Sequence, residues 1–297
     1  IQDMNVIRKR LEVGKGGGLA RAAAQQSSST NMVSLILSDV LGDPLDLIAS
    51  GPTVRDTSTA HNAWQLVQQH LIPKGLELPP KVLALLEQGS NSTDDNNDND
   101  TTIHYGPTCL VGHNALAVTR AADVAQELGY HPIVLGTQFQ GEARDAATFL
   151  VSMAQHLQQQ SPPSKYSMAT KFPVALIAGG ETTVTLPSDA TQTGKGGRNQ
   201  ELALTAAVTM RQQRQASGLP PLRNIVVASV GTDGTDGPTD AAGAVVDGGT
   251  LARLGGDVTE SLQHHDAYHY LEQVDPQGNS PLIRTGPTGT NVADIMM

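Results

Sequence analysis

The stretch TCLVGHNALAVTRAADVAQELGYHPIVLG, residues 108–136, decides the fold class. Its two ends, 108–112 and 131–136, are short apolar runs of strand composition, and residues 113–129 between them have the apolar spacing of a helix. A second helical pattern follows at 142–160. Strands that alternate with helices of this length are typical of a parallel sheet. The sequence therefore predicts an α/β protein.

The residues before this stretch predict mostly helices. We expect helices over residues 1–28, with a break at Gly14, and over 59–71 and 79–89, and a strand over 31–38.

The residues after the stretch predict a second unit. The polar residues 158–171 are the best linker between the two units. The expected elements are two strands joined by a glycine turn over 172–187, a glycine-rich loop that enters a long helix over 193–215, a strand over 224–230, short helices over 241–255 and 258–273, and a last strand within 285–297.

The composition excludes several classes of function. Nineteen basic residues against 29 acidic ones give a net charge of -10 without any Lys/Arg-rich run, which argues against nucleic acids and anionic membranes as partners. No apolar run reaches the ~18 residues of a membrane span. The single cysteine, Cys109, excludes an internal disulfide framework, and its apolar neighbours predict a buried, inert thiol. The segment 90–102 is polar and of low complexity, which predicts a solvated loop. It is not a calcium-binding EF-hand loop, because the fixed glycine and the terminal glutamate of that motif are missing.

The segment GKGGRNQE, residues 194–201, has the features of an anion site. Its glycines let backbone N–H groups approach an anion, the predicted helix begins near Asn199, and Lys195 and Arg198 supply positive charge. It lacks the G-x-x-x-x-G-K-[ST] spacing of a Walker A motif. A flexible turn with basic residues on the surface is the alternative interpretation.

The loop VGTDGTDGPTD, residues 230–240, places Asp233, Asp236 and Asp240 directly after an apolar strand. Ligands of open α/β sheets bind beyond the carboxyl ends of strands, where carboxylates hold Mg²⁺, orient a hydroxyl group or accept a proton. Together with the anion site, the loop indicates metal-assisted phosphoryl transfer. The alternative is that the aspartates order turns and cap the following helix, and we expect Asp240 to do only that.

A third segment, SDVLGDPLDLIASGPT at residues 38–53, also follows an apolar strand. Asp39 and Asp43 lie among small residues, and residues 50–53 are expected to form a tight turn, so a functional and a structural role fit equally well. Other kinds of site have no support. The nine histidines show no metal-ligand spacing, and C-x-x-C, H-E-x-x-H and G-x-S-x-G are all missing.

Five segments in this order resemble the glycerate 2-kinase family, whose C-terminal half is called the MOFRL domain: SDVLGDPLDLIASGPTVRD, GGETTVTL, GKGGRNQELAL, GTDGTDGPTDAAGAVVDG and TGPTGTNVAD. The opening NVIRKRLEVGKGGGLA is similar to a family segment that ends in Lys-Gly-Gly. The resemblance covers nearly the whole chain except residues 88–104. It implies two α/β domains with the active site in the cleft between them. An incomplete Rossmann-like parallel-sheet domain over 1–160, with a disordered insertion at 89–103, is followed by a smaller α/β MOFRL domain over 172–297.

The resemblance also implies an activity. The family phosphorylates D-glycerate to 2-phosphoglycerate with ATP and Mg²⁺, in the cytoplasm or the mitochondrion, and a homodimer is compatible with it. Two alternatives stay open. One is a hydroxypyruvate reductase, although no G-x-G-x-x-G follows a strand to support a nicotinamide site. The other is a catalytically inactive binding fragment, since the chain starts at Ile1 in the middle of a pattern.

Roles for individual residues follow from the resemblance. Arg198 matches an arginine essential for catalysis, and an aspartate of the acidic loop matches an essential acid, with Asp233 favoured over Asp236. Both aspartates are candidate Mg²⁺ ligands, and Lys195 is a further catalytic candidate. A third essential residue, a lysine in a glycine-rich segment, is expected upstream of Ile1. The candidate residues for binding glycerate and nucleotide are Lys15, Ser38, Asp39, Ser50, Gly51, Thr53, Gly180, Glu181, Gly196, Gly197, Asn199, Thr232, Thr288 and Asn291.

Overall fold

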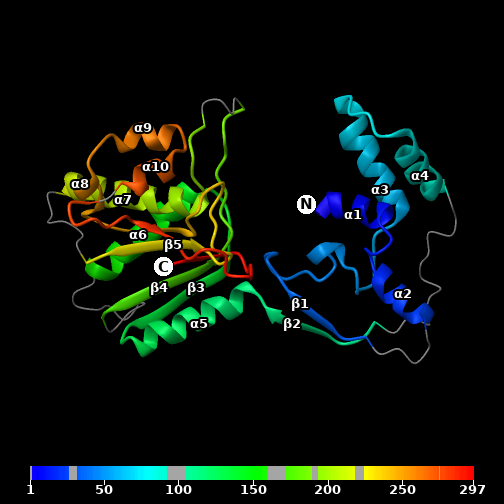
Figure 1. Cartoon of the computed structure of the whole chain (residues 1–297), viewed down its shortest axis with the longest axis horizontal. Helices are drawn as coiled ribbons and strands as arrows, with labels where there is room; N and C mark the ends of the chain where they lie inside the picture. Colours follow the sequence, from blue (N-terminus) through cyan, green and yellow to red (C-terminus); the bar gives the residue numbers. More distant parts are fainter. Residues whose placement is uncertain are drawn as a thin grey trace. The chain divides into compact units, whose positions relative to one another are not determined.

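The computed structural model in Figure 1 describes residues 2–26, 32–91, 105–159, 172–188, 193–217, 224–273 and 275–297. Most of the predicted polar loop and of the predicted linker lies outside these residues. The chain divides into two compact units by its contacts: Ile1–Ile36 with Gly42–Val111, and Leu37–Leu41 with Gly112–Met297. This division is not the predicted domain boundary between 160 and 172, which stays a prediction. No described helix is long and apolar enough to cross a membrane.

The first unit is mostly helical, as predicted. Its helices are α1 (Gln2–Leu11), α2 (Gly18–Gln26), η1 (Ile48–Ser50), α3 (Ala60–Leu66), η2 (Val67–Leu71), η3 (Ile72–Lys74) and α4 (Pro80–Asn91). Helix α3 begins where Thr59 and Asn62 form a capping box. A small core of Ala63, Val67 and Leu86 holds α3 and α4 together.

Strands β1 (Ser34–Leu37) and β2 (Thr108–Gly112) form a two-stranded sheet of their own. The pair is parallel, because the bonded residues advance together, from Ser34 N to Pro107 O and from Ser38 N to Gly112 O. Both strands were predicted. The prediction of a buried thiol was wrong, because Cys109 in β2 is exposed. A sheet of two strands leaves alternate side chains uncovered, as it does for Leu35 and Val111.

The second unit is a six-stranded sheet in the order β3-β4-β8-β5-β6-β7. Its strands are β3 (His131–Phe139), β4 (Val174–Gly180), β5 (Val226–Gly231), β6 (Gly243–Asp247), β7 (Leu282–Ile283) and β8 (Asp294–Met296). Its helices are α5 (Asn114–Glu127), α6 (Ala143–Gln159), α7 (Arg198–Ser217), α8 (Thr250–Leu254), α9 (Val258–Gln263) and α10 (Ala267–Glu272). Helix α5 packs on one face of the sheet, where Val118 meets Ile177, and α7 with α6 beside it packs on the other (Figure 1).

This sheet is mixed. The expected parallel pairing holds for β3 with β4, and β2 pairs with β1 in the separate sheet, so the two strands of the 108–136 stretch do not share a sheet. Strands β3 and β4 are parallel, but the β4–β8, β8–β5, β5–β6 and β6–β7 pairs are all antiparallel. The last strand of the chain, β8, inserts between β4 and β5 and separates two strands that a βαβ unit would place side by side. Local periodicity carries no information about such a long-range pairing.

Two further local predictions were wrong. Residues 243–247 were expected to be helical but form β6, in which Ala244 and Val246 are buried and Val245 between them is exposed, the period of a strand. Residues 181–187 were expected to form a strand, but with the rest of the described chain they make a single bridge, between Thr183 and Glu142. The remaining predicted strands and the long helix α7 are confirmed.

Candidate functional site

Charged residues gather at the carboxyl end of the central strands of the second unit. Asp294 opens β8 and is paired in register with Gly180, the last residue of β4, on one side and with Gly231, the last residue of β5, on the other. Since β8 runs antiparallel to both strands, its first residue lies where they end. Arg198, the first residue of α7, reaches the same edge.

The guanidinium of Arg198 is held by two carboxylates. Its Nε donates to Oδ2 of Asp294 at 2.5 Å and its Nη2 donates to Oδ1 at 3.0 Å, which is a bidentate contact. Its Nη1 lies 2.9 Å from Oε1 of Glu181, the residue after β4. Burial by itself lowers the pKa of Arg198, but the hydrogen bond and charge of Asp294 raise it above its ordinary value. The arginine is therefore a fixed positive charge.

Asp236 caps the start of α7 from a distant loop. Its Oδ1 accepts from Asn199 N at 3.1 Å and Asn199 Nδ2 at 3.2 Å, and its Oδ2 accepts from Gln200 N at 2.8 Å. The residue is 3% exposed, and burial raises its pKa to about 6 although these hydrogen bonds act in the opposite direction. The anion at this helix terminus is thus an internal carboxylate.

The glycines before α7 make room for this cap. A Cβ on Gly197 would lie 2.3 Å from Cγ of Asp236, whereas a Cβ on Gly196 would find its nearest atoms at an ordinary 3.4 Å. Asn199 extends the network, since its Oδ1 accepts from Ser229 Oγ at 2.5 Å. The predicted residues Gly197 and Asn199 therefore hold the acidic loop against α7.

Asp233 is the aspartate that the fold leaves available. Its Oδ1 accepts from Thr235 N at 3.0 Å, and its Oδ2 accepts no hydrogen bond from the described residues. A Cβ on Gly231 would lie 3.1 Å from Asp233 Oδ1 and 3.6 Å from Asp294 Oδ1, so both carboxylates border the same space.

The loop that carries Asp233 is tied to the residues before β8. Thr232 Oγ1 donates to Ala293 O at 2.7 Å, Thr288 Oγ1 donates to Thr232 O, and Thr288 N donates to Asp233 O at 3.1 Å. The predicted residues Thr232 and Thr288 thus make structural contacts at the site.

Lys195 and Asp240 both contact Tyr268 in helix α10. The Nζ of Lys195 lies 4.1 Å from the centre of the Tyr268 ring, which is a cation–π contact. The main-chain N–H of Lys195 donates to Asp266 Oδ1. Asp240 accepts from Tyr268 Oη at 2.7 Å and from Arg284 Nε at 3.0 Å. The prediction that Asp240 caps a helix was wrong, because strand β6 follows it and Asp236 caps α7 instead.

Two predicted residues near β1 belong to the second unit. Ser38 is buried, and its Oγ lies 3.3 Å from both N and O of Val40, which makes a local turn. Asp39 is exposed and accepts from Asn291 Nδ2 at 3.3 Å. Asn291 in turn accepts from Ala293 N, so these contacts continue into the start of β8.

The remaining predicted residues lie in the first unit, around an unusual turn. Ala49, Ser50 and Gly51 have φ values of 51°, 62° and 61°, three left-handed residues in a row. Such a conformation costs roughly 1–2 kcal/mol for each residue other than glycine. Gly16 N donates to Ser50 O at 2.9 Å and Gly17 N to Gly51 O at 2.7 Å, which fixes the turn. Strain of this kind is retained where surrounding contacts determine it.

Lys15 lies beside this turn but is paired locally, with Nζ 2.6 Å from Glu12 Oε2, and Thr53 is partly buried. The side chain of the neighbouring Asp56 is 4% exposed. Although burial acts in the other direction, hydrogen bonds from Ser58 and the charges of Lys9 and Arg10 hold the pKa of Asp56 below its usual value.

The structure limits the candidate metal ligands. Among the described residues there is no group of three or more His, Cys, Asp or Glu that could hold a metal ion. Both carboxylate oxygens of Asp236 accept hydrogen bonds from the start of α7, so this carboxylate acts as a helix cap, and its role as an Mg²⁺ ligand stays a prediction. Asp233 retains an oxygen that accepts no hydrogen bond from the described residues, which fits Mg²⁺ as an ion that takes one or two carboxylates and completes its shell with phosphates and water.

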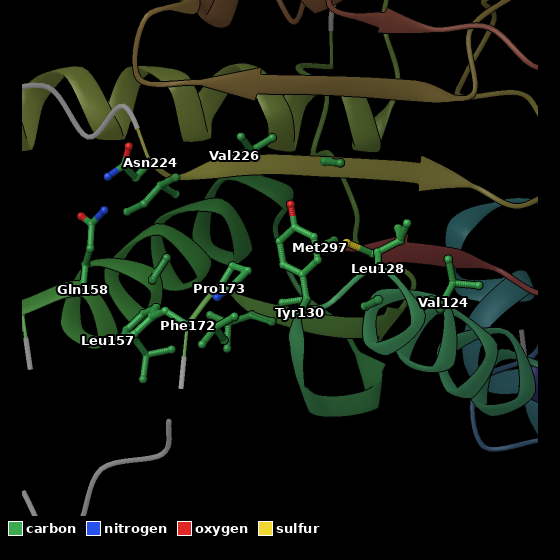
Figure 2. Close-up of a pocket in the computed structure, with 18 of the residues that line it drawn as sticks. Val124, Leu128, Tyr130, Leu157, Gln158, Phe172, Pro173, Asn224, Val226 and Met297 are labelled. Carbon is green, nitrogen blue, oxygen red and sulfur yellow. The ribbon is translucent and has the colours of Figure 1, made fainter. Parts of the chain in front are cut away.

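A large apolar pocket lies at the opposite end of the same sheet. It has a volume of about 1190 Å³ and is lined by residues of helices α5 and α6, by residues that precede β3, β4 and β5 or belong to the first half of β4 and β5, and by Met297 after β8. Figure 2 shows the side chains that surround it, among them Leu128, Tyr130, Phe172, Val226 and Met297. None of the predicted site residues lines it.

Sequence reasoning missed Asp294 as a site residue. It stands in the TGPTGTNVAD segment, and an acidic residue at the start of a short apolar strand is a signal for it. Its partner is 96 residues away in the chain, so only the fold shows the contact.

Two family models match this chain. The MOFRL family matches residues 174–294, and a domain of unknown function, DUF4147, matches residues 1–87. The D-glycerate 2-kinase of Thermotoga maritima is 36% identical over 301 residues, which are 100% of this chain and 62% of that protein. The crystal structure of a Thermotoga maritima glycerate kinase matches with a TM-score of 0.75 at 35% identity, over 99% of this chain and 62% of that one. The chain thus spans about six tenths of the length of these relatives.

The glycerate kinase of Macaca fascicularis is 35% identical over 335 residues, covering 99% of this chain and 77% of that protein. Because about a third of the residues are identical over nearly all of this chain and over three quarters of that relative, the chain belongs to the glycerate kinase family.

Proposed function

We propose that the protein at its full natural length is a glycerate 2-kinase, which transfers the γ-phosphoryl group of ATP to the C2 hydroxyl group of D-glycerate. The observation that carries the proposal is Arg198, fixed by Asp294 at the carboxyl end of the sheet beside the available carboxylate of Asp233. The names of the relatives, glycerate kinases of three quite different organisms, support the substrate.

The chemistry needs positioning and charge neutralisation more than covalent help. The C2 oxygen of glycerate bonds to the γ-phosphorus while the bond from that phosphorus to the bridging oxygen breaks, and ADP leaves. Arg198 binds the equatorial phosphoryl oxygens and neutralises their charge. Asp233 provides the carboxylate that either holds Mg²⁺ or accepts the proton of the C2 hydroxyl group. Mg²⁺, when bound, neutralises charge on the nucleotide phosphates.

The proposal includes the domain organisation and the substrate contacts of the first unit. Residues 1–160 are the C-terminal part of a Rossmann-like domain, which the parallel pairing of β1 and β2 supports, and 172–297 are the MOFRL domain. Lys15 with Gly16 and Gly17, or the turn at residues 50–53, binds the carboxylate of glycerate. The N–H groups of Gly16, Gly17, Ser50 and Gly51 already donate to backbone carbonyls, so the positive charge of Lys15 is what supports this assignment.

The test is a reaction of the full-length protein with Mg-ATP and D-glycerate, followed by ³¹P NMR. We expect the signals of 2-phosphoglycerate and ADP. Formation of 3-phosphoglycerate would overturn the C2 assignment alone. If no phosphorylated product forms but NADH is consumed with hydroxypyruvate, the reductase alternative holds. If neither reaction occurs in a folded protein, the chain is a binding protein and the proposed function is wrong.

A further inference from the structure

The two carboxylates on Arg198 differ sharply in their surroundings. The side chain of Asp294 is 1% exposed, whereas that of Glu181 is 43% exposed. Asp294 accepts two N–H donors of the guanidinium, whereas Glu181 lies within ion-pair distance of Nη1. A bidentate contact fixes the orientation of a guanidinium group, whereas a single exposed ion pair does not.

The donors that remain define where a ligand binds. A guanidinium has five N–H groups, one on Nε and two on each Nη. Asp294 occupies Nε and one N–H of Nη2, so the edge formed by Nη1 and Nη2 faces away from it. That edge is the one that matches two oxygens of a phosphoryl group. Glu181 Oε1 lies 2.9 Å from Nη1, one of the two nitrogens of this edge.

Asp294 itself is held rigidly. Its neighbours in register on both sides are glycines, Gly180 and Gly231, which leave space for the carboxylate and the guanidinium. Its main-chain oxygen accepts from Asn114 Nδ2 at 3.0 Å, and the same amide group donates to Val292 O at 2.8 Å. Gly179 allows this approach, since a Cβ there would lie 1.9 Å from Asn114 Oδ1.

We propose that Asp294 is a positioning residue for phosphoryl transfer: it fixes the Nε edge of Arg198 so that the Nη1–Nη2 edge is presented to the phosphoryl group, while Glu181 only occupies that edge in the absence of ligand. This inference rests on the proposed function. It adds a residue that works through Arg198 and does not touch the substrate.

The test compares two substitutions that each remove one negative charge from the same arginine. Asp294→Asn is expected to lower kcat on the order of 10²-fold, a part of the 10³-fold or larger effect of a transition-state arginine. The KM for ATP is expected to change less than threefold, because orientation matters most in the transition state. Glu181→Gln is expected to lower kcat at least tenfold less than Asp294→Asn does. Equal losses in kcat for the two variants would overturn the proposal.

A double-mutant cycle separates positioning from a general structural role. If Asp294 acts through Arg198, adding Asp294→Asn to Arg198→Ala costs no further activity, whereas additive losses contradict the proposal. Guanidinium ion added to Arg198→Ala is expected to restore part of kcat only while Asp294 is present. Rescue that is equal with and without Asp294 would also contradict it.

One measurement does not depend on any variant folding. In ¹⁵N NMR spectra of the wild-type protein, the Nε–H of Arg198 is expected to exchange slowly with water, because a buried carboxylate protects it. Rapid exchange of that proton would overturn the proposal. The wild-type activity assay is run first: a lack of product there refutes the proposed function, whereas a fully active Asp294→Asn enzyme refutes only the positioning role.

Discussion

The two ends of the six-stranded sheet differ in almost every property. The amino end of β3, β4 and β5 carries the large apolar pocket of about 1190 Å³. The carboxyl end carries Arg198, Asp294 and the acidic glycine-rich loop. The same strands thus carry an apolar pocket at their amino ends and charged residues at their carboxyl ends. Under the proposed function, the chemistry lies at the end where loops bring charged side chains together and not at the larger pocket.

The largest expected effect separates the two ends by activity. Arg198→Lys keeps the charge but loses the planar contact with Asp294, so kcat is expected to fall on the order of 10³-fold in the full-length enzyme. The matched change at the other end is Leu128→Ala, in the pocket lining, which is expected to stay within about twofold of wild type. Steady-state kinetics of both variants test this, and an Arg198→Lys enzyme with near wild-type kcat would remove the reason for locating the chemistry at the carboxyl end.

A second prediction concerns the buried charge at the carboxyl end. Burial raises the pKa of Asp236 from 3.8 to about 6. The folded state therefore binds the proton more tightly than the unfolded state, so this group's stabilisation is complete below pH 3.8 and is lost as the pH rises through 6. The loss in the free energy of unfolding amounts to roughly 3 kcal/mol.

Urea unfolding of wild type and of Asp236→Asn between pH 4 and pH 7 measures this contribution, and the variant is expected to show the weaker pH dependence. A ¹³C titration of the Asp236 carboxyl group with a midpoint below 4 would show that the hydrogen bonds from α7 outweigh burial. Asp56 in the first unit contributes a pH dependence of folding stability with the opposite sign. Its pKa is lowered in the folded state, so its stabilisation is lost as the pH falls.

The role of Asp233 comes next in size. Asp233→Asn is expected to lower kcat on the order of 10²-fold, because the available carboxylate oxygen is lost while the bond from Thr235 N is retained. A changed Mg²⁺ dependence would assign the carboxylate to the metal, and a changed pH profile would assign it to the proton. Unchanged kcat together with unchanged Mg²⁺ dependence excludes both roles.

The smallest effect tests the glycines before α7. Gly197→Ala forces a Cβ to within 2.3 Å of Asp236 Cγ and is expected to destabilise the fold by about 2 kcal/mol through loss of the helix cap. Gly196→Ala is the matched control, since its Cβ meets only ordinary contacts, and it is expected to change stability by less than about 0.5 kcal/mol. Equal unfolding midpoints for the two variants would mean that the loop relaxes and that the cap is not rigid.

The sequence by itself determined most of the local structure and the family of the protein. Its periodicity predicted the helices and most strands, its motifs predicted membership of the glycerate kinase family, and its glycine-rich and acidic segments predicted where α7 and the acidic loop lie. Such features depend on residues three or four apart, or on short fixed spacings, so they can be read without the fold. The α/β class was predictable for the same reason.

Only the tertiary structure decided which charges meet. It inserted β8 between β4 and β5, assigned Asp236 to the cap of α7, and joined Arg198 to Asp294 across 96 residues of chain. Three aspartates in one loop look alike in sequence, yet one is buried against a helix, one is exposed beside Tyr268, and one is available at the site. The reason is physical: burial and partners set the role of a carboxylate, and both are properties of the packed fold.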